Sequence, residues 1–204
     1  MARRDLSDIT RAALLDAAIH EFAAHGFDGA STRAIAMRAG VHQPQINYHF
    51  ASKSDLWRAA VALLFEELEV ESTAMMKGAR GQRATLEAAI RAFVHHAARR
   101  PELNRIMVHE SSVPSERLSW LVHTYVQERF DAVIALWDPL RRRRIAIDID
   151  GVTAFYMMLG GGTLLYTNSP EARLISGVEP TAPERIEAHA SMLVAMLLPG
   201  RSTS

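Results

Sequence analysis

Cysteine is absent from this 204-residue sequence, and neither sign of charge is in surplus. Without cysteine the chain forms no disulfide, no thiolate metal site and no cysteine nucleophile. The 23 Lys and Arg residues equal the 23 Asp and Glu residues, which excludes a strongly basic protein that coats nucleic acid indiscriminately. Apolar residues make up 49% and charged residues 23%, proportions typical of a folded globular protein.

Long hydrophobic runs are also missing. Arg3 and Arg4 are not followed by the apolar stretch of a signal peptide. Residues 151–170 carry no charge, but the apolar part, 152–166, is 15 residues long and a bilayer crossing needs about 20. We therefore expect a cytoplasmic protein that does not span a membrane, with this segment forming a helix buried on most sides.

Apolar residues recur three and four positions apart along most of the chain, which is the spacing of amphipathic helices. The pattern predicts an all-α fold of about nine helices, the first ended by Gly26 and a long one running from Ser52 to about Met76. A later long helix should end before Pro139, leaving the four arginines 141–144 in a solvated loop. The prolines and glycine between 170 and 183 predict another loop.

Two short helices around a glycine turn are predicted near the N-terminus. Ser31 can cap the first, Gly40 permits the left-handed backbone of the turn, and residues 43–50 form the second, with Pro44 in its first turn. This is the arrangement of a helix-turn-helix. A helical hairpin with a solvated polar face is the alternative. The pattern changes character near residue 55, which divides the chain into domains 1–55 and 56–204.

Polar residues remain once the inward-facing apolar positions of this segment are assigned. Gln and Asn can bond adenine edges in the major groove, while Tyr, His, Thr and Lys commonly hold phosphate oxygens. Residues 29–54 contain Arg33, Arg38 and Lys53 and no acid, so a local charge of +3 lies where the polar side chains lie.

The string from Thr32 through Gly40-Val41 to Ile46-Asn-Tyr-His-Phe50 resembles the N-terminal signature of TetR-family transcriptional regulators. The resemblance covers roughly residues 9–60. It implies an N-terminal three-helix DNA-binding domain joined by a long helix to a larger helical domain for effector binding and dimerisation. It also implies that some of these residues read bases and others grip phosphates: Thr32, Arg33, Gln43, Pro44, Gln45, Asn47, Tyr48, His49 and Lys53.

The second domain is expected to form a homodimer and to enclose a small, mostly apolar effector. Dimerisation is indicated independently by the small residues 160–162 and by a final helix too apolar to face water. A two-fold dimer predicts a near-palindromic double-stranded DNA operator. Large apolar residues with a few polar groups are the candidates for the effector pocket, and ordinary core packing is the alternative for each: Met107, Glu110, Trp120, His123, Tyr125, Phe155 and Tyr156.

Signatures of catalysis and of metal binding are absent from the sequence. It contains no Gly-x-Ser-x-Gly, no Gly-x-x-x-x-Gly-Lys and no His-x-x-x-His spacing, so we expect no enzyme, no cofactor and no metal site. The sequence thus predicts a ligand-responsive DNA-binding transcriptional regulator, with repression as its expected mode. The alternative is a helical ligand-binding module without specific DNA binding.

Overall fold

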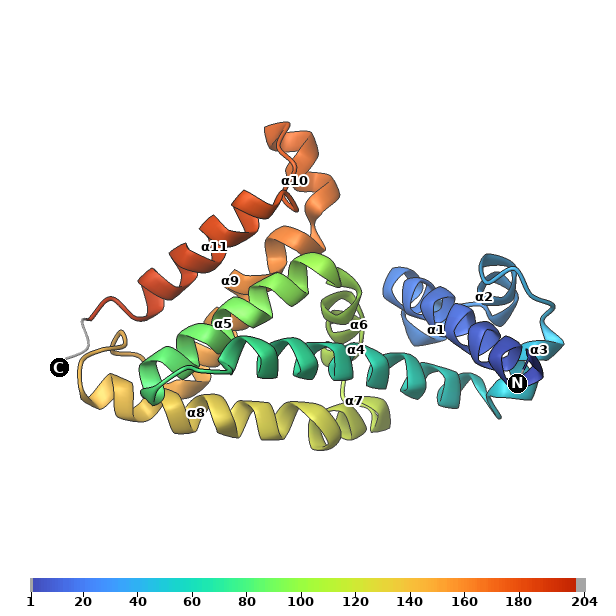
Figure 1. Ribbon diagram of the computed structural model, residues 1–204, viewed down its shortest axis with the longest axis horizontal. Coiled ribbons are helices and arrows are strands. Elements are labelled where there is room, and N and C mark those ends of the chain that lie inside the picture. The colour runs from blue at the N-terminus through green and yellow to red at the C-terminus, as the bar shows by residue number, and fades with distance from the viewer. Residues whose placement is uncertain (1, 201–204) are drawn as a thin grey trace.

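The computed structural model describes residues 2–200, with side chains described from Ser7 onward. Over that range the fold is all-α, as predicted, with eleven α-helices, one π-helical turn and no strand (Figure 1). The elements are α1 (Ala2–Gly29), α2 (Thr32–Arg38), α3 (Pro44–His49), α4 (Lys53–Met76), α5 (Gly81–Arg99), α6 (Pro101–Ser111), α7 (Glu116–Leu121), η1 (Val122–Val126), α8 (Gln127–Arg142), α9 (Gly151–Thr167), α10 (Ser169–Ser176) and α11 (Pro183–Leu197).

Helix α4 connects the N-terminal helices to the rest of the molecule (Figure 1). Figure 1 shows α1, α2 and α3 grouped at the N-terminal end of α4, with the remaining helices gathered along its other end. A capping interaction begins the helix, because the Ser52 hydroxyl accepts from the Asp55 backbone N–H at 3.0 Å and donates to the Asp55 carboxylate at 2.7 Å. The predicted start and the predicted end at Met76 are both confirmed.

Two hydrophobic cores hold the helices together. The first unites α1–α4 with α6 and α7, so the buried side of α4 serves the N-terminal helices and part of the second domain alike. The second core joins α5, α8, α9 and α11, with Trp137 fully buried at its centre. Because the first core crosses residue 55, α1–α3 do not bury their apolar faces independently of the helices that follow.

One predicted helix end is confirmed and another is wrong. Gly26 breaks the helical backbone of α1 with φ 66° and ψ 179°, as predicted, and a short second helical stretch follows it to Gly29 within the same element. Pro139 lies inside α8, one turn from its end, where the buried neighbours Trp137 and Leu140 hold the helix in place. The arginine run 141–144 therefore begins in the last turn of α8, where positively charged side chains interact favourably with the helix dipole.

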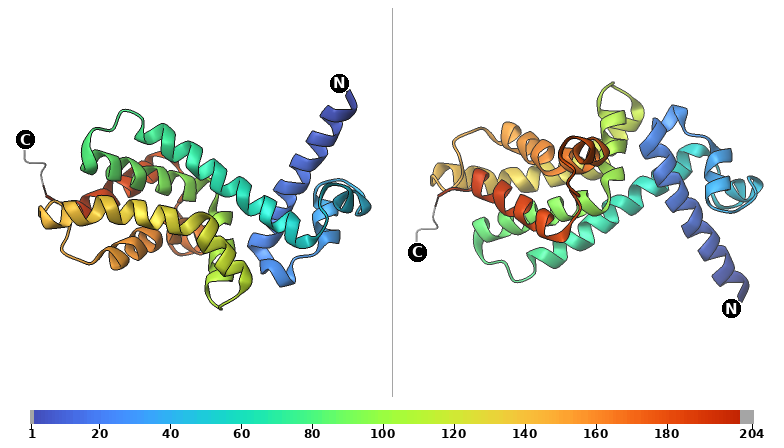
Figure 2. Two further views of the ribbon diagram at one scale, coloured as in Figure 1. Left: turned by 90° about the horizontal axis from the view of Figure 1, so that it is seen from below. Right: turned by 90° about the horizontal axis from the view of Figure 1, so that it is seen from above.

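The segment after α9 also differs from the prediction. Residues 169–176 form α10 instead of a loop, with Pro170 tolerated in its first turn. A bidentate ion pair between Arg173 and Glu179, with both contacts at 2.7 Å, fastens the chain that follows the helix. Figure 1 shows α10 projecting from the body of the second domain, and the right-hand view of Figure 2 looks onto this projection from above.

Helix α9 is not buried on most sides, contrary to the prediction. One face packs inward through residues such as Ala154, Met158 and Tyr166, which are at most 6% exposed. The opposite face is apolar but open, with Tyr156 66% and Leu164 59% exposed. A helix that is apolar all round thus has one face in the second core and an exposed apolar face on the other side.

Candidate nucleic-acid interface

The turn between α2 and α3 has the geometry of a helix-turn-helix. Ser31 Oγ caps α2 by accepting from the Ala34 N–H at 3.3 Å, and Gly40 adopts φ 68°, the left-handed conformation that lets the chain reverse. The Val41 N–H then donates to the Ala36 carbonyl at 3.0 Å, which closes the turn. The predicted roles of Ser31 and Gly40 are confirmed.

The inward faces of α2 and α3 fix which side chains point outward. Ile35, Ala36 and Ile46 are at most 2% exposed and join the first core, as does Phe50 at the end of α3. The remaining predicted contact residues lie on the outer side of the two helices. Thr32 and His49 are half-buried there, and the exposed ones are Arg33, Gln43, Pro44, Gln45, Asn47 and Tyr48.

Four of the predicted contact residues already have hydrogen-bond partners within the chain. Gln43 Nε2 donates to Thr32 Oγ1 at 3.3 Å, which ties α3 to the start of α2. Gln45 Oε1 accepts from the His42 backbone N–H at 3.0 Å, so this side chain caps its own helix. Lys53 Nζ donates to the Asp28 carbonyl at 3.3 Å and stands 4.9 Å from the Phe27 ring. Lys53 therefore holds the end of α1 in the absence of DNA.

Positive charge on this surface is not neutralised internally. Neither Arg33 nor Arg38 forms a side-chain hydrogen bond or ion pair with any residue between 7 and 200, and both are exposed. The local charge of +3 predicted for residues 29–54 is thus presented together with amide, hydroxyl and imidazole groups. Such a surface can approach a phosphate backbone and offer hydrogen bonds to base edges.

The predicted effector residues fall into separate places. Met107, Trp120 and Tyr125 pack against the first core, where Tyr125 stacks on Phe65 with ring centroids 4.5 Å apart. Glu110 is 5% exposed and accepts a hydrogen bond from Arg117 at 2.9 Å.

The other three predicted effector residues lie elsewhere. His123 is exposed, Phe155 lies against Phe130, and Tyr156 points outward from α9. The structure therefore does not bring all seven candidates together.

An aromatic cluster near the N-terminal end of α4 contains two of these candidates, Trp120 and Tyr125. Trp57, 1% exposed, lies between Phe27 and Trp120, with ring centroids 6.0 and 5.5 Å away, and Trp120 meets Tyr125 edge-on. The buried indole N–H of Trp57 has no acceptor within the described chain. A buried donor without a partner is costly, so this cluster can gain free energy from a ligand that supplies an acceptor.

Two surface hollows of the described chain involve none of the seven candidates. One, of about 270 Å³, lies between the start of α5 and the end of α8 and is lined by Arg80, Arg83 and Arg143 among others. The other, of about 370 Å³, follows the open faces of α9 and α11. Across residues 7–200, no three His, Asp or Glu side chains converge in the way that metal binding requires.

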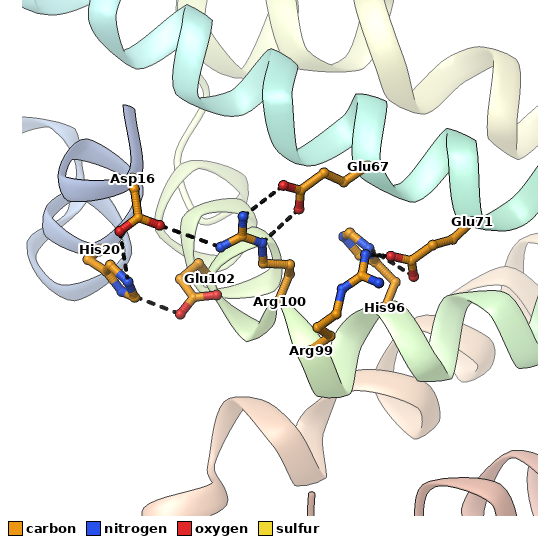
Figure 3. Close-up of polar contacts among 8 residues, drawn as sticks. All are labelled: Asp16, His20, Glu67, Glu71, His96, Arg99, Arg100 and Glu102. Atoms are coloured by element: carbon orange, nitrogen blue, oxygen red, sulfur yellow. Dashed lines mark hydrogen bonds and ion pairs between the residues drawn. The ribbon is translucent and has the colours of Figure 1, made fainter. Parts of the chain in front are cut away.

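A chain of polar contacts joins the N-terminal helices to the second domain (Figure 3). Arg100, between α5 and α6, binds Glu67 of α4 through two contacts of 2.7 Å and lies 3.7 Å from Asp16 of α1. His20 of α1 stands 3.5 Å from Glu102 of α6. Sequence reasoning missed these residues, and no local pattern could have found them, because the contacts join positions more than thirty residues apart.

Comparison with known proteins places this architecture. The family model described as bacterial regulatory proteins, tetR family, matches residues 14–60. AibR in complex with isovaleryl coenzyme A and operator DNA is similar over 94% of this chain and 100% of its own, with a TM-score of 0.75 at 17% identity. HlyIIR, a hemolysin II transcriptional regulator, is similar over 94% and 98%, with a TM-score of 0.71 at 17% identity.

Proposed function

We propose that this chain, a member of the TetR family of bacterial regulatory proteins through residues 14–60, is a homodimeric repressor that a small effector releases from its operator. The observation that carries the proposal is the surface of α2 and α3. There, two exposed arginines of α2 without ion-pair partners among the described residues occur in the same helix-turn-helix as the exposed amide side chains of α3. An enzymatic activity forms no part of this function, and we place the protein in the cytoplasm. No helix between residues 2 and 200 is long and apolar enough to cross a membrane.

In the proposed complex, the two kinds of contact come from different parts of the surface. Arg33, Gln43 and Asn47 read base edges in the major groove, because they are exposed and carry the donors and acceptors that bases recognise. Thr32, Tyr48, His49 and Lys53 hold phosphates on either side. Pro44 and Gln45 shape the start of α3, where Gln45 serves as an internal cap.

Dimerisation is supported by the open apolar face of α9 and α11. Met192 and Met196 of α11, at 62% and 57% exposed, line the same hollow as Met157 and Gly160 of α9. A second copy that covers this face about a two-fold axis would present two α3 helices to one side of the duplex. Successive major grooves on that side are about 34–36 Å apart, so the operator should be near-palindromic.

Effector binding is proposed at the aromatic cluster of Trp57, Trp120 and Tyr125. The cluster is apolar, offers an unpaired indole N–H, and touches both α4 and Phe27 of the N-terminal domain. A ligand inserted there would move α4 against α1 and change the separation of the two α3 helices. The ligand empties the operator only if it binds the separated form more tightly, by about 5 kcal/mol for a nearly complete switch.

A mobility-shift titration tests the proposal. The duplex is the region upstream of the gene, and a duplex of shuffled sequence is the control. We expect the upstream duplex to be bound at least about a thousandfold more tightly than the shuffled one at physiological salt. Equal affinity for both duplexes would contradict the proposal. It would favour the alternative, a helical ligand-binding module that does not bind DNA specifically.

Effector release is tested in the same assay. Isovaleryl coenzyme A is the first probe, because AibR was solved with it, and small aromatic and aliphatic acids follow. An effector should dissociate the shifted complex and raise the melting temperature of the free protein. A compound that raises the melting temperature without affecting the complex would not be the effector.

A further inference from the structure

Arg100 occupies the single residue that separates α5 from α6. It ends α5, its N–H donates to the His96 carbonyl at 2.7 Å, and Pro101 begins the next helix. Because proline disfavours helical backbone in the residue before it, Arg100 adopts φ −128° and ψ 63°. The bend is therefore fixed by the sequence, and it directs the Arg100 side chain between α1 and α4, as Figure 3 shows.

Its guanidinium group contacts both of these helices. Nε and Nη2 each donate to a different oxygen of Glu67 at 2.7 Å, the planar paired geometry that holds a carboxylate in one orientation. Nη1 lies 3.7 Å from Asp16 of α1. The hydrogen bond from Arg100 lowers the pKa of Glu67, so this pair stays charged at neutral pH.

The face of α1 that meets Arg100 and Glu102 carries two polar side chains, Asp16 and His20, one helical turn apart. Asp16 faces Arg100, and one turn later His20 faces Glu102, which is only 9% exposed. The same helix uses its other face to build the core with α2 and α3. Moving α1 relative to Arg100 and Glu102 therefore moves the whole helix-turn-helix.

We infer that Arg100 is a positioning residue, which fixes the placement of the DNA-binding domain on the second domain by binding Glu67 and Asp16 at once. Only the expected change in operator affinity rests on the proposed function; the placement of α1 does not. Once α4 shifts, Arg100 follows Glu67, and the contact with Asp16 carries that movement to α1. Loss of the contact leaves the domain distributed over several placements, of which a fraction fits the operator.

The test measures the placement directly. The chain has no cysteine, so Ala24→Cys in α1 and Glu128→Cys in α8, both exposed, accept one spin label each. Pulsed electron resonance gives the distance distribution between them, with labelled protein diluted in unlabelled protein so that only pairs within one chain contribute. The variants are Arg100→Met and Asp16→Asn. The second changes an exposed side chain and leaves the Arg100–Glu67 pair intact, so folding is preserved.

Arg83→Met is the matched control. Its side chain is 25% exposed against 24% for Arg100, and it also binds a glutamate, Glu87, but at the far end of α5. We expect a broader distribution in Arg100→Met and Asp16→Asn, and the wild-type distribution in Arg83→Met. Operator affinity should fall about tenfold in Arg100→Met, while affinity for random duplex stays unchanged, because the groups that contact DNA are intact.

Two results would overturn the inference. One is a wild-type distribution in both Asp16→Asn and Arg100→Met. The other is equal broadening in Arg83→Met, which would indicate general loosening. The distance measurement does not require DNA or a dimer. If the wild-type protein binds no duplex specifically, the proposed function fails, and the distributions still decide whether Arg100 positions α1.

Discussion

The side chains on the outer face of α3 divide into those that stabilise the helix and those that remain available to a partner. Gln45 belongs to the first group, because its amide oxygen accepts from the His42 N–H at the helix start. Asn47 and Tyr48 belong to the second, since both are exposed and neither has a hydrogen-bond partner among the described residues. Base recognition in α3 should therefore depend on Gln43 and Asn47 more than on Gln45.

Gln43→Ala should reduce discrimination between operator and random duplex about tenfold to a hundredfold. A bidentate amide-to-base contact is worth about 1–3 kcal/mol of discrimination, and alanine cannot make it. Fluorescence anisotropy with both duplexes measures the ratio of affinities. Gln127→Ala, which removes an exposed glutamine from α8, is the control and should leave the ratio unchanged. An unchanged ratio in Gln43→Ala would assign base recognition elsewhere.

Lys53→Ala should weaken binding to operator and random duplex alike. A lysine that contacts one phosphate releases about one counterion, so the slope of log affinity against log salt should become shallower by about 0.9. Anisotropy titrations at several salt concentrations give this slope. Lys77 at the other end of α4 is exposed, and Lys77→Ala is the control. A slope that does not change would show that Lys53 stays on the Asp28 carbonyl in the complex.

His96 predicts a pH dependence of stability. It is 1% exposed, and burial lowers its pKa from 6.5 to about 4, although the nearby charges of Glu67 and Glu102 act in the opposite direction. Below pH 6.5 the unfolded chain takes up a proton at this ring, whereas the folded chain does so only near pH 4. Stability is therefore lost as the pH falls through this window.

Urea unfolding of wild-type protein and His96→Met measures this contribution. Between pH 7 and pH 5 the wild type should lose about 2 kcal/mol more than the variant. His42→Met, at an exposed position, should lose as much as the wild type. Parallel losses in wild type and His96→Met would mean that His96 is protonated in the folded state.

Local sequence signals predicted the helix-turn-helix residues but not the junction. Ser31, Gly40 and Ser52 act on backbone groups within a few residues, so their roles follow from short-range chemistry and are confirmed. Arg100 and Asp16 are 84 positions apart, and their contact depends on how α1, α4 and α6 pack. No rule of spacing along one helix indicates such a pair.

Among the elements, α9 contains three consecutive glycines, Gly160, Gly161 and Gly162, whose surroundings differ. A methyl group on Gly162 would lie 3.1 Å from Phe93, and one on Gly161 would lie 3.1 Å from Leu193, so these two glycines let neighbouring helices approach within the chain. Gly160 has no described atom within 4 Å of that position. The run of three glycines was predicted as a dimer contact; Gly160 and Gly161 are exposed and line the hollow along α9 and α11, whereas Gly162 is buried.

The final helix is joined to α9 by a short relay of hydrogen bonds. The Tyr166 hydroxyl and His189 Nδ1 are 2.9 Å apart, and His189 Nε2 donates to the Gly161 carbonyl at 2.8 Å. Burial raises the pKa of Tyr166 to about 12, so the hydroxyl remains the donor. The open apolar face of these two helices is thus presented by a fixed pair.

Leu164→Glu combined with Met192→Glu should dissociate the dimer. Both side chains are exposed in one chain, at 59% and 62%, so the substitutions cost little in the monomer. In a dimer they would bury carboxylates, which should raise the dissociation constant at least about a hundredfold. Sedimentation analysis should give the mass of two chains for wild type and for Val70→Glu, and 22.6 kDa for the double variant. A wild-type monomer would contradict the proposed interface.

Element boundaries were predictable where a cap or glycine marks them and not where burial overrides a local signal. The start and end of α4 follow from Ser52 and the glycine after its end, Gly78. Pro139 normally ends a helix, yet α8 continues because Trp137 and Leu140 anchor its last turn in the second core. The end of α8 is therefore set by the packing of these side chains, which the spacing of apolar residues along the sequence does not predict.

Over the whole molecule, equal numbers of acids and bases hide an uneven arrangement. Carboxylates are placed at the junctions of helices, as with Glu67, Glu102 and Glu110, where arginines or histidines meet them. Arg33 and Arg38 of α2 are exposed and have no such partner among residues 7–200. A neutral protein arranged in this way should bind random DNA weakly and depend on base contacts for affinity.

A hydroxyl-radical footprint on the upstream duplex tests the central claim of a symmetric, sequence-reading dimer most directly. The account predicts two protected segments on one face of the DNA, centred about 34–36 Å apart and related by a two-fold axis. Addition of the effector should remove both together. A single protected segment, or protection that does not depend on sequence, would contradict the account.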